Sequence, residues 1–150
     1  MELTKEIPYE IHNTGMISRE TLQKPVSWMI RKNHQQIEWN NYSKYENAIR
    51  AVQIVPNSAK LEKLADLKGI GPVVGTGILH YLYPQTFPIM NRHCCEALKK
   101  LNYISYEVPD TSKYNAYRAV VLNIIAFCKP YSLRELDMAL NAYNKLHKTL

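Results

Sequence analysis

The stretch that decides the fold runs from Leu67 to Leu79 and reads Leu-Lys-Gly-Ile-Gly-Pro-Val-Val-Gly-Thr-Gly-Ile-Leu. Four of the chain's five glycines fall within it. Gly69 and Gly71 can adopt a positive φ, as a tight turn requires, because glycine has no Cβ. Pro72 has a fixed φ and no N–H, so it suits the first position of a following helix. The pattern therefore predicts a tight turn that opens a helix.

The start of that helix is a candidate anion site. We expect the main-chain amides of Val73, Val74 and Gly75 to have no acceptor within their own helix, and the helix dipole adds partial positive charge there. A phosphate group is the natural ligand for such amides. An ordinary glycine cap between two packed helices is the competing interpretation.

A short helix is predicted before the turn, from Ser58 to Leu67. It carries Lys60 and Lys63, and Lys68 follows it. The resulting order is helix, hairpin, helix, with lysines beside the hairpin. These lysines disfavour a hairpin that only packs two helices together.

The composition is that of one globular domain. The chain has 150 residues, 46% of them hydrophobic and 21% charged, which fits one core rather than two. We expect an irregular segment over residues 1–17 and a single domain over residues 18–150. No apolar run approaches the roughly 18 residues of a membrane span, and no signal-peptide core is seen near Met1. A cytoplasmic location without membrane attachment is expected.

The charge favours a polyanionic partner. Nineteen Lys and Arg against thirteen Asp and Glu give a net charge of +6, which attracts nucleic acid. The three cysteines fit neither a disulfide framework nor a zinc site, so we expect reduced thiols with at least one in the core. No metal site is predicted, because no ligand spacing joins His80, His93, Cys94 and Cys95.

Apolar residues recur at helical spacing and strand signals are nearly absent, so we expect an all-α bundle of about seven helices. Capping boxes at Ser43–Glu46 and Ser132–Glu135 open two of them. Others are predicted to cover Pro25–Trp39 and to begin at Arg92 and at Ser112. The predicted inward residues are Val74, Gly77, Ile78, Tyr81 and Leu82 after the hairpin, Cys95, Leu98 and Leu101 next, then Tyr117, Val120, Val121, Ile124, Ile125 and Cys128, and finally Leu133, Leu136, Leu140 and Tyr143.

Three separated segments together resemble the helix-hairpin-helix base-excision DNA glycosylase superfamily, and small bacterial and archaeal members most of all. They are Leu67–Leu79, Phe87–Asn91 and Leu133–Leu140, and the resemblance spans Trp28 to Lys145. It implies an all-helical, glycosylase-like domain whose hairpin grips the DNA backbone beside the target nucleotide. It also implies no cofactor, apart from a monovalent cation that some members hold at the hairpin carbonyls.

Two positions depart from that resemblance. Bifunctional members carry a lysine where this chain has Val73, so Schiff-base lyase chemistry from the hairpin is not expected. Active members carry an aspartate where this chain has Asn91, and an amide supplies neither a full negative charge nor a general base. Asn91 is the candidate catalytic residue. Capping of the helix that begins at Arg92 is the competing role.

The candidate nucleic-acid contacts follow from the hairpin and from the start of that later helix. They are Lys63, Lys68, Gly69, Gly71, Val73, Val74, Gly75 and Arg92. His93 is expected to be a solvated side chain, with proton transfer as the alternative. For Asp137 we expect a pairing with Arg118 or Arg134.

Three functions are compatible with these residues. The first is a monofunctional DNA N-glycosylase, an enzyme of the hydrolase class acting in base excision repair. The second is a non-catalytic DNA-binding module, or a subunit of a repair or defence assembly. The third is a domain in which the turn only packs helices. The small size leaves open a protein partner that completes the DNA cleft.

Overall fold

The computed structural model describes residues 20–21, 43–129 and 131–148, and every regular element in this part of the chain is helical. The all-α expectation is therefore confirmed for these residues. The irregular segment over residues 1–17 and the helix over Pro25–Trp39 lie outside them. The α-helices are α3 (Ser43–Val52), α4 (Lys60–Ala65), α5 (Gly71–Leu82), α6 (Arg92–Lys100), α7 (Tyr114–Phe127) and α8 (Leu133–Leu146), with 3-10 turns at Asn57–Ala59 and Thr111–Lys113.

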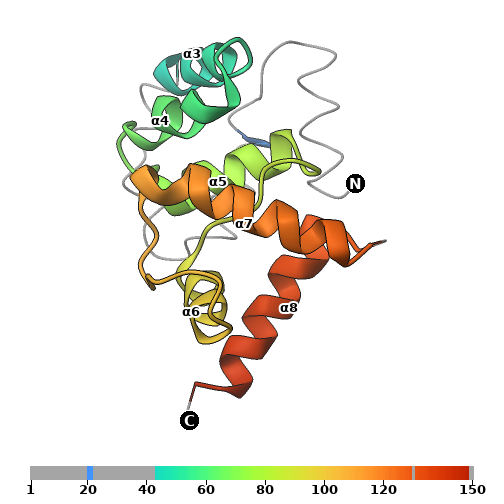
Figure 1. Ribbon diagram of the computed structural model, residues 1–150. Helices are drawn as coiled ribbons and strands as arrows, with labels where there is room; N and C mark the ends of the chain where they lie inside the picture. Colours follow the sequence, from blue (N-terminus) through green and yellow to red (C-terminus); the bar gives the residue numbers. More distant parts are fainter. Residues whose placement is uncertain (1–19, 22–42, 130, 149–150) are drawn as a thin grey trace.

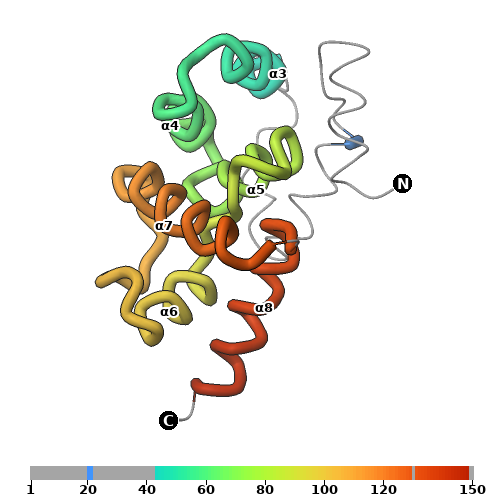
Figure 2. The backbone as a smooth tube through the Cα atoms, turned by 45° about the vertical axis from the view of Figure 1, so that its right-hand side comes forward, coloured from blue at the N-terminus to red at the C-terminus, as the bar shows by residue number. Residues whose placement is uncertain are grey.

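The helices form two groups joined through α5 and α7. Figures 1 and 2 show α3 and α4 at one end, α6 and the C-terminal half of α8 at the other, and α5 and α7 between them. The contacts between elements agree, because α3 packs on α4, α4 on α5, and α6 on α8. One core runs through both groups, and its least exposed members include Tyr45, Ile49, Leu64, Leu79, Phe87, Met90, Leu98, Tyr114 and Tyr117.

Helix α5 is the centre of that core. The inward stripe predicted for it is confirmed, since Val74, Gly77, Ile78, Tyr81 and Leu82 are all buried. Every residue from Val74 to Leu82 is in fact buried, so the helix is enclosed on all sides rather than amphipathic. A Cβ placed on Gly75 would lie 2.7 Å from Leu61 Cδ1, which shows how closely α4 approaches α5.

The later helices follow the predicted boundaries with one difference. Helix α6 begins at Arg92, and the capping box from Ser132 to Glu135 opens α8, as predicted. The helix predicted from Ser112 instead begins at Tyr114, because Asp110 accepts the Ser112 N–H and holds a 3-10 turn there.

The inward set predicted for α6 is wrong at Leu101, which is 40% exposed. The helix ends at Lys100, and Asn102 takes a φ of +66°. Tyr103 N–H then donates to Leu98 O and Asn102 N–H to Lys99 O, both at 2.9 Å. This is a Schellman cap, and it turns the chain outward before Leu101 can join the core.

The inward sets of α7 and α8 are confirmed in part. Tyr117, Val121, Leu133 and Leu140 are buried as predicted. The other predicted members are half-buried: Val120, Ile124, Ile125, Cys128, Leu136 and Tyr143. All three cysteines are free thiols, with Cys94 and Cys95 buried, as expected.

Candidate nucleic-acid interface

The turn between α4 and α5 has the backbone conformation that its glycines predicted. Gly69 has a φ of +83° and Gly71 a φ of +61°, both in the left-handed region. Ile70 N–H donates to Leu67 O at 3.1 Å and closes the turn. A residue with a Cβ would be strained at either glycine, so the two glycines account for the tightness of the turn.

A buried tyrosine of α3 supports this turn. The Tyr45 hydroxyl donates to Lys68 O at 2.9 Å, and Tyr45 is 1% exposed. No local sequence pattern links these two residues, because they lie 23 positions apart in the chain. The carbonyls of Leu67 and Lys68 thus already accept hydrogen bonds, and a monovalent cation at the turn's carbonyls stays a prediction.

The amides at the start of α5 differ from the expectation. Because the helix begins at Gly71, its own hydrogen bonds use amides from Val74 onward. Val74 and Gly75 are also buried, so this structure does not support a ligand contact through these two residues. Gly71 and Val73 remain as candidate main-chain contacts at the start of α5. Both are half-buried, and in a helix that begins at Gly71 their positions come before the first amide that bonds within the helix.

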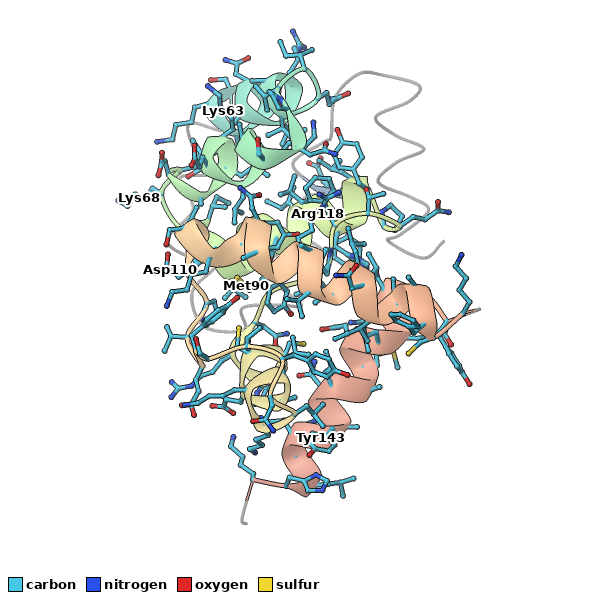
Figure 3. All side chains as sticks on the ribbon, in the orientation of Figure 1. Lys63, Lys68, Met90, Asp110, Arg118 and Tyr143 are labelled. Atoms are coloured by element: carbon cyan, nitrogen blue, oxygen red, sulfur yellow. The ribbon has the colours of Figure 1, made fainter. Side chains whose placement is uncertain are left out.

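Two of the predicted lysines flank this turn and one does not. Lys63 and Lys68 are exposed and lie on the same side of the molecule (Figure 3). Lys60 is 5% exposed, and its Nζ donates to Val52 O and to Val55 O, the latter at 2.9 Å. Burial lowers the pKa of Lys60. Lys60 therefore closes the end of α3 and is not a surface contact.

The side of the molecule that carries Lys68 also presents residues from a distant segment. The 3-10 turn over Thr111–Lys113 packs on α4, and Lys113 in it is exposed. Figure 3 shows Asp110 on the same side as Lys68. Hydrogen bonds from Ser112 lower the pKa of Asp110, which keeps that carboxylate charged. Sequence analysis missed Lys113 because only the fold brings it to α4.

The segment from Phe87 to Asn91 is fixed by hydrogen bonds from α5 and α7. Met90 N–H donates to Thr76 Oγ1 at 2.9 Å. The hydroxyls of Tyr114 and Tyr117 donate to Pro88 O at 2.7 Å and to Ile89 O at 3.0 Å. Thr76 lies five residues beyond Gly71, about 7.5 Å along the helix axis. The segment before Asn91 is therefore fixed against α5, within two helical turns of Gly71.

Asn91 has the capping role that competed with a catalytic one. It is the N-cap of α6, and its side chain accepts the Cys94 N–H at 2.9 Å. Arg92 pairs with Glu96 at 3.1 Å and remains largely exposed. His93 is not simply solvated, since its Nδ1 lies 3.2 Å from Asn144 Nδ2, from which it accepts a hydrogen bond.

A cleft of about 370 Å³ lies between the start of α6 and α8, and we call it the α6–α8 cleft. Asp137 is its buried carboxylate. As predicted, Asp137 pairs with Arg134, and it also accepts hydrogen bonds from Cys94 Sγ at 3.1 Å and Asn141 Nδ2 at 3.3 Å. Burial and the neighbouring Asp137 raise the pKa of the Cys94 thiol. The cleft is lined by Asn91, Arg134, Asp137, Met138, Asn141, Ala142 and Lys145.

The other predicted partner of Asp137 has a different role. Arg118 donates to Thr86 O at 2.7 Å and lies over the Phe87 ring at 4.5 Å.

Among the described residues, no cluster of His, Cys, Asp or Glu side chains could hold a metal ion. None of the described helices combines the length and the apolar character needed to cross a membrane.

Comparisons of the chain with protein-family models, with curated proteins and with solved structures found no match.

Proposed function

We propose that this chain binds DNA through the turn between α4 and α5. The observation that carries the proposal is the pair of left-handed glycines, Gly69 and Gly71, which open a helix whose Gly71 and Val73 amides come before the first amide that bonds within the helix. Unpaired amides at a helix start, with the positive end of its dipole, bind phosphate oxygens. The glycine turn permits close approach of a DNA backbone.

The positive charges around the turn also favour DNA as the ligand. Lys63 and Lys68 are exposed beside it, and Lys113 lies on a segment that packs against α4. The net charge of +6 adds long-range attraction. Contacts of this kind hold the phosphates and carry no base sequence information, so binding is expected to be independent of sequence.

Removal of a base by hydrolysis of its N-glycosidic bond is the second candidate function. It is favoured by the position of Asn91 in the lining of the α6–α8 cleft, directly after a segment that is fixed against α5. It is opposed by the chemistry of the residue, because Asn91 has an amide that already caps α6. We therefore propose a helix-hairpin-helix protein that resembles monofunctional glycosylases and binds DNA with little or no turnover.

A salt titration of duplex binding tests the proposal. Each phosphate contact contributes about 0.9 to the slope of log affinity against log salt. We expect Lys63→Ala with Lys68→Ala to reduce that slope by up to about 1.8. Lys129→Ala is the matched control, since Lys129 is exposed just beyond the end of α7. No binding at low salt, or an equal loss in the control, would refute DNA binding at the turn.

An assay with damaged bases separates the two candidates. Duplexes that contain uracil, 8-oxoguanine, alkylated purines or mismatches are incubated with the protein and then treated with alkali. We expect little strand cleavage by the natural chain and a gain in Asn91→Asp, because aspartate keeps the cap and adds the missing charge. Cleavage by the natural chain would favour the enzyme, and a silent Asn91→Asp variant would favour a module without a catalytic pocket.

A further inference from the structure

The outer side of α7 differs from that of an ordinary surface helix, which carries charged and polar residues there. Figure 1 shows this helix passing in front of α5. Its one charged residue, Arg118, donates to Thr86 O and lies over the Phe87 ring. Its exposed residues are all uncharged: Asn115, Ala116, Ala119, Asn123, Ala126 and Phe127. A surface depleted of charge in this way is typical of a protein–protein interface.

Two hollows meet at Cys128, directly after the end of α7. The first, which we call the Met138 hollow, has a volume of about 410 Å³ and lies between α7 and α8, with Tyr131 and Met138 in its lining. The second has a volume of about 390 Å³ and is lined in part by Phe127 and by Tyr103, which follows α6. Because Cys128 lines both hollows, they form one continuous surface, which we call the Phe127 face.

The exposed area of the Phe127 face is comparable with what a dimer needs. The exposed fractions are 92% for Phe127, 61% for Tyr131 and 54% for Tyr103. With about 200 Å² for a complete aromatic side chain, these three residues together expose about 400 Å². One side of a standard interface buries about 800 Å², and about 65% of a homodimer interface is apolar. The three side chains therefore supply most of the apolar area that one partner contributes.

The charges favour a second copy of this chain over an anionic partner. Of the described residues that line the two hollows only Glu135 is charged, and its carboxylate accepts the Ser132 N–H in the capping box of α8. A nucleic acid or an anionic membrane would need positive charge, which this lining lacks. Two copies with a net charge of +6 repel each other, so they associate best where neither presents positive charge.

The shape of the Phe127 face is also self-complementary. Phe127 projects from it with 92% of its surface exposed, and the apolar Met138 hollow adjoins it at Cys128. A projecting side chain and a hollow on the same surface allow two identical copies to make two equivalent contacts about a twofold axis.

We infer that two copies of this chain associate through the Phe127 face, with Phe127 of each copy in the Met138 hollow of the other. Each contact removes a nearly fully exposed aromatic side chain from water, and this burial is the main driving force of association. The dimer is closed, because the twofold axis uses the same face of both copies. The inference goes beyond the proposed DNA binding and does not depend on it.

The test is sedimentation velocity of the full chain over a series of concentrations. The natural chain is expected to shift from a mass of 17.4 kDa to twice that mass as its concentration rises. Phe127→Glu should weaken the dimer at least tenfold, because it brings a charge into an apolar hollow. Met138→Glu, on the receiving side of the contact, should do the same and serves if Phe127→Glu does not fold.

Leu146→Glu is the matched control. Leu146 is also an exposed apolar residue, but it lies at the last position of α8, at the other end of that helix from the Met138 hollow. This variant should dimerise like the natural chain. A natural chain with the mass of one copy at every concentration, or equal weakening in the control and in the two face variants, would overturn the inference.

Cys128 shows whether the contact is at this face. Its thiol is accessible in dilute protein, but it lines both hollows and is shielded in the proposed dimer. Its reaction with a thiol reagent should therefore slow as the natural chain dimerises and should not slow at the same concentrations of Phe127→Glu. A natural chain that dimerises while Cys128 reacts at an unchanged rate would have its contact elsewhere, and the inference would be wrong. No DNA is present in these assays, so their result is independent of the proposed function.

Discussion

Thr76 provides the sharpest test of how the Asn91 segment is held. Its Oγ1 accepts the Met90 N–H at 2.9 Å and donates to Val73 O at 3.0 Å. Both Thr76 and Met90 are 0% exposed. Thr76→Val keeps the shape of the side chain and leaves the Met90 N–H buried without a partner. An unsatisfied buried donor costs about 1–3 kcal/mol, so we expect the free energy of unfolding to fall by about 2 kcal/mol.

The assay is urea denaturation followed by far-ultraviolet circular dichroism, with Thr76→Ser as the matched control. Serine keeps the hydroxyl and loses one buried methyl group, at a cost of about 0.8 kcal/mol. For a chain of 150 residues, a loss of 2 kcal/mol corresponds to a melting temperature about 4–8 °C lower. The reasoning is refuted if Thr76→Val is as stable as the natural chain, or more stable than Thr76→Ser.

The thiols provide two further predictions. Cys128 is half-buried, whereas Cys94 and Cys95 are buried. A thiol reagent should therefore modify Cys128 rapidly and the other two cysteines only when the protein unfolds. Rapid modification of two cysteines would contradict the packing of α6. Burial raises the pKa of Cys95 from 9.0 to about 12, and its contribution to stability is therefore complete below pH 9 and is lost as pH rises from 9 toward 12. Denaturation series across that range should show falling stability, with a smaller fall in Cys95→Ala; an equal fall in both proteins would show that this thiol is not the cause.

The features that the sequence predicted most accurately are local ones, in which a residue type has one common structural role. Gly69 and Gly71 predicted a turn with positive φ, and the Ser132 to Glu135 spacing predicted a capping box, because both patterns are local. Of the two partners predicted for Asp137, Arg118 and Arg134, the structure has Arg134, which lies three residues away in the same helix. These are interactions between near neighbours in the chain.

Long-range arrangements were less predictable. Lys60 was grouped with the lysines beside the hairpin, but carbonyls at and just beyond the end of α3 accept its hydrogen bonds, and it is buried there. The support of Lys68 by Tyr45 and the α6–α8 cleft both depend on how helices distant in sequence pack. Helical periodicity shows which face is apolar and does not show which helix covers it.

The enclosure of α5 has a kinetic consequence. The glycine turn is the end of a helix that is buried from Val74 to Leu82, and Tyr45 holds it from a second side. Because this part of the fold is buried and held from two sides, we expect the proposed DNA contact to need no rearrangement before docking. Stopped-flow mixing with a fluorescent duplex should then give a single exponential whose rate rises linearly with concentration, whereas a plateau would reveal a slow opening step.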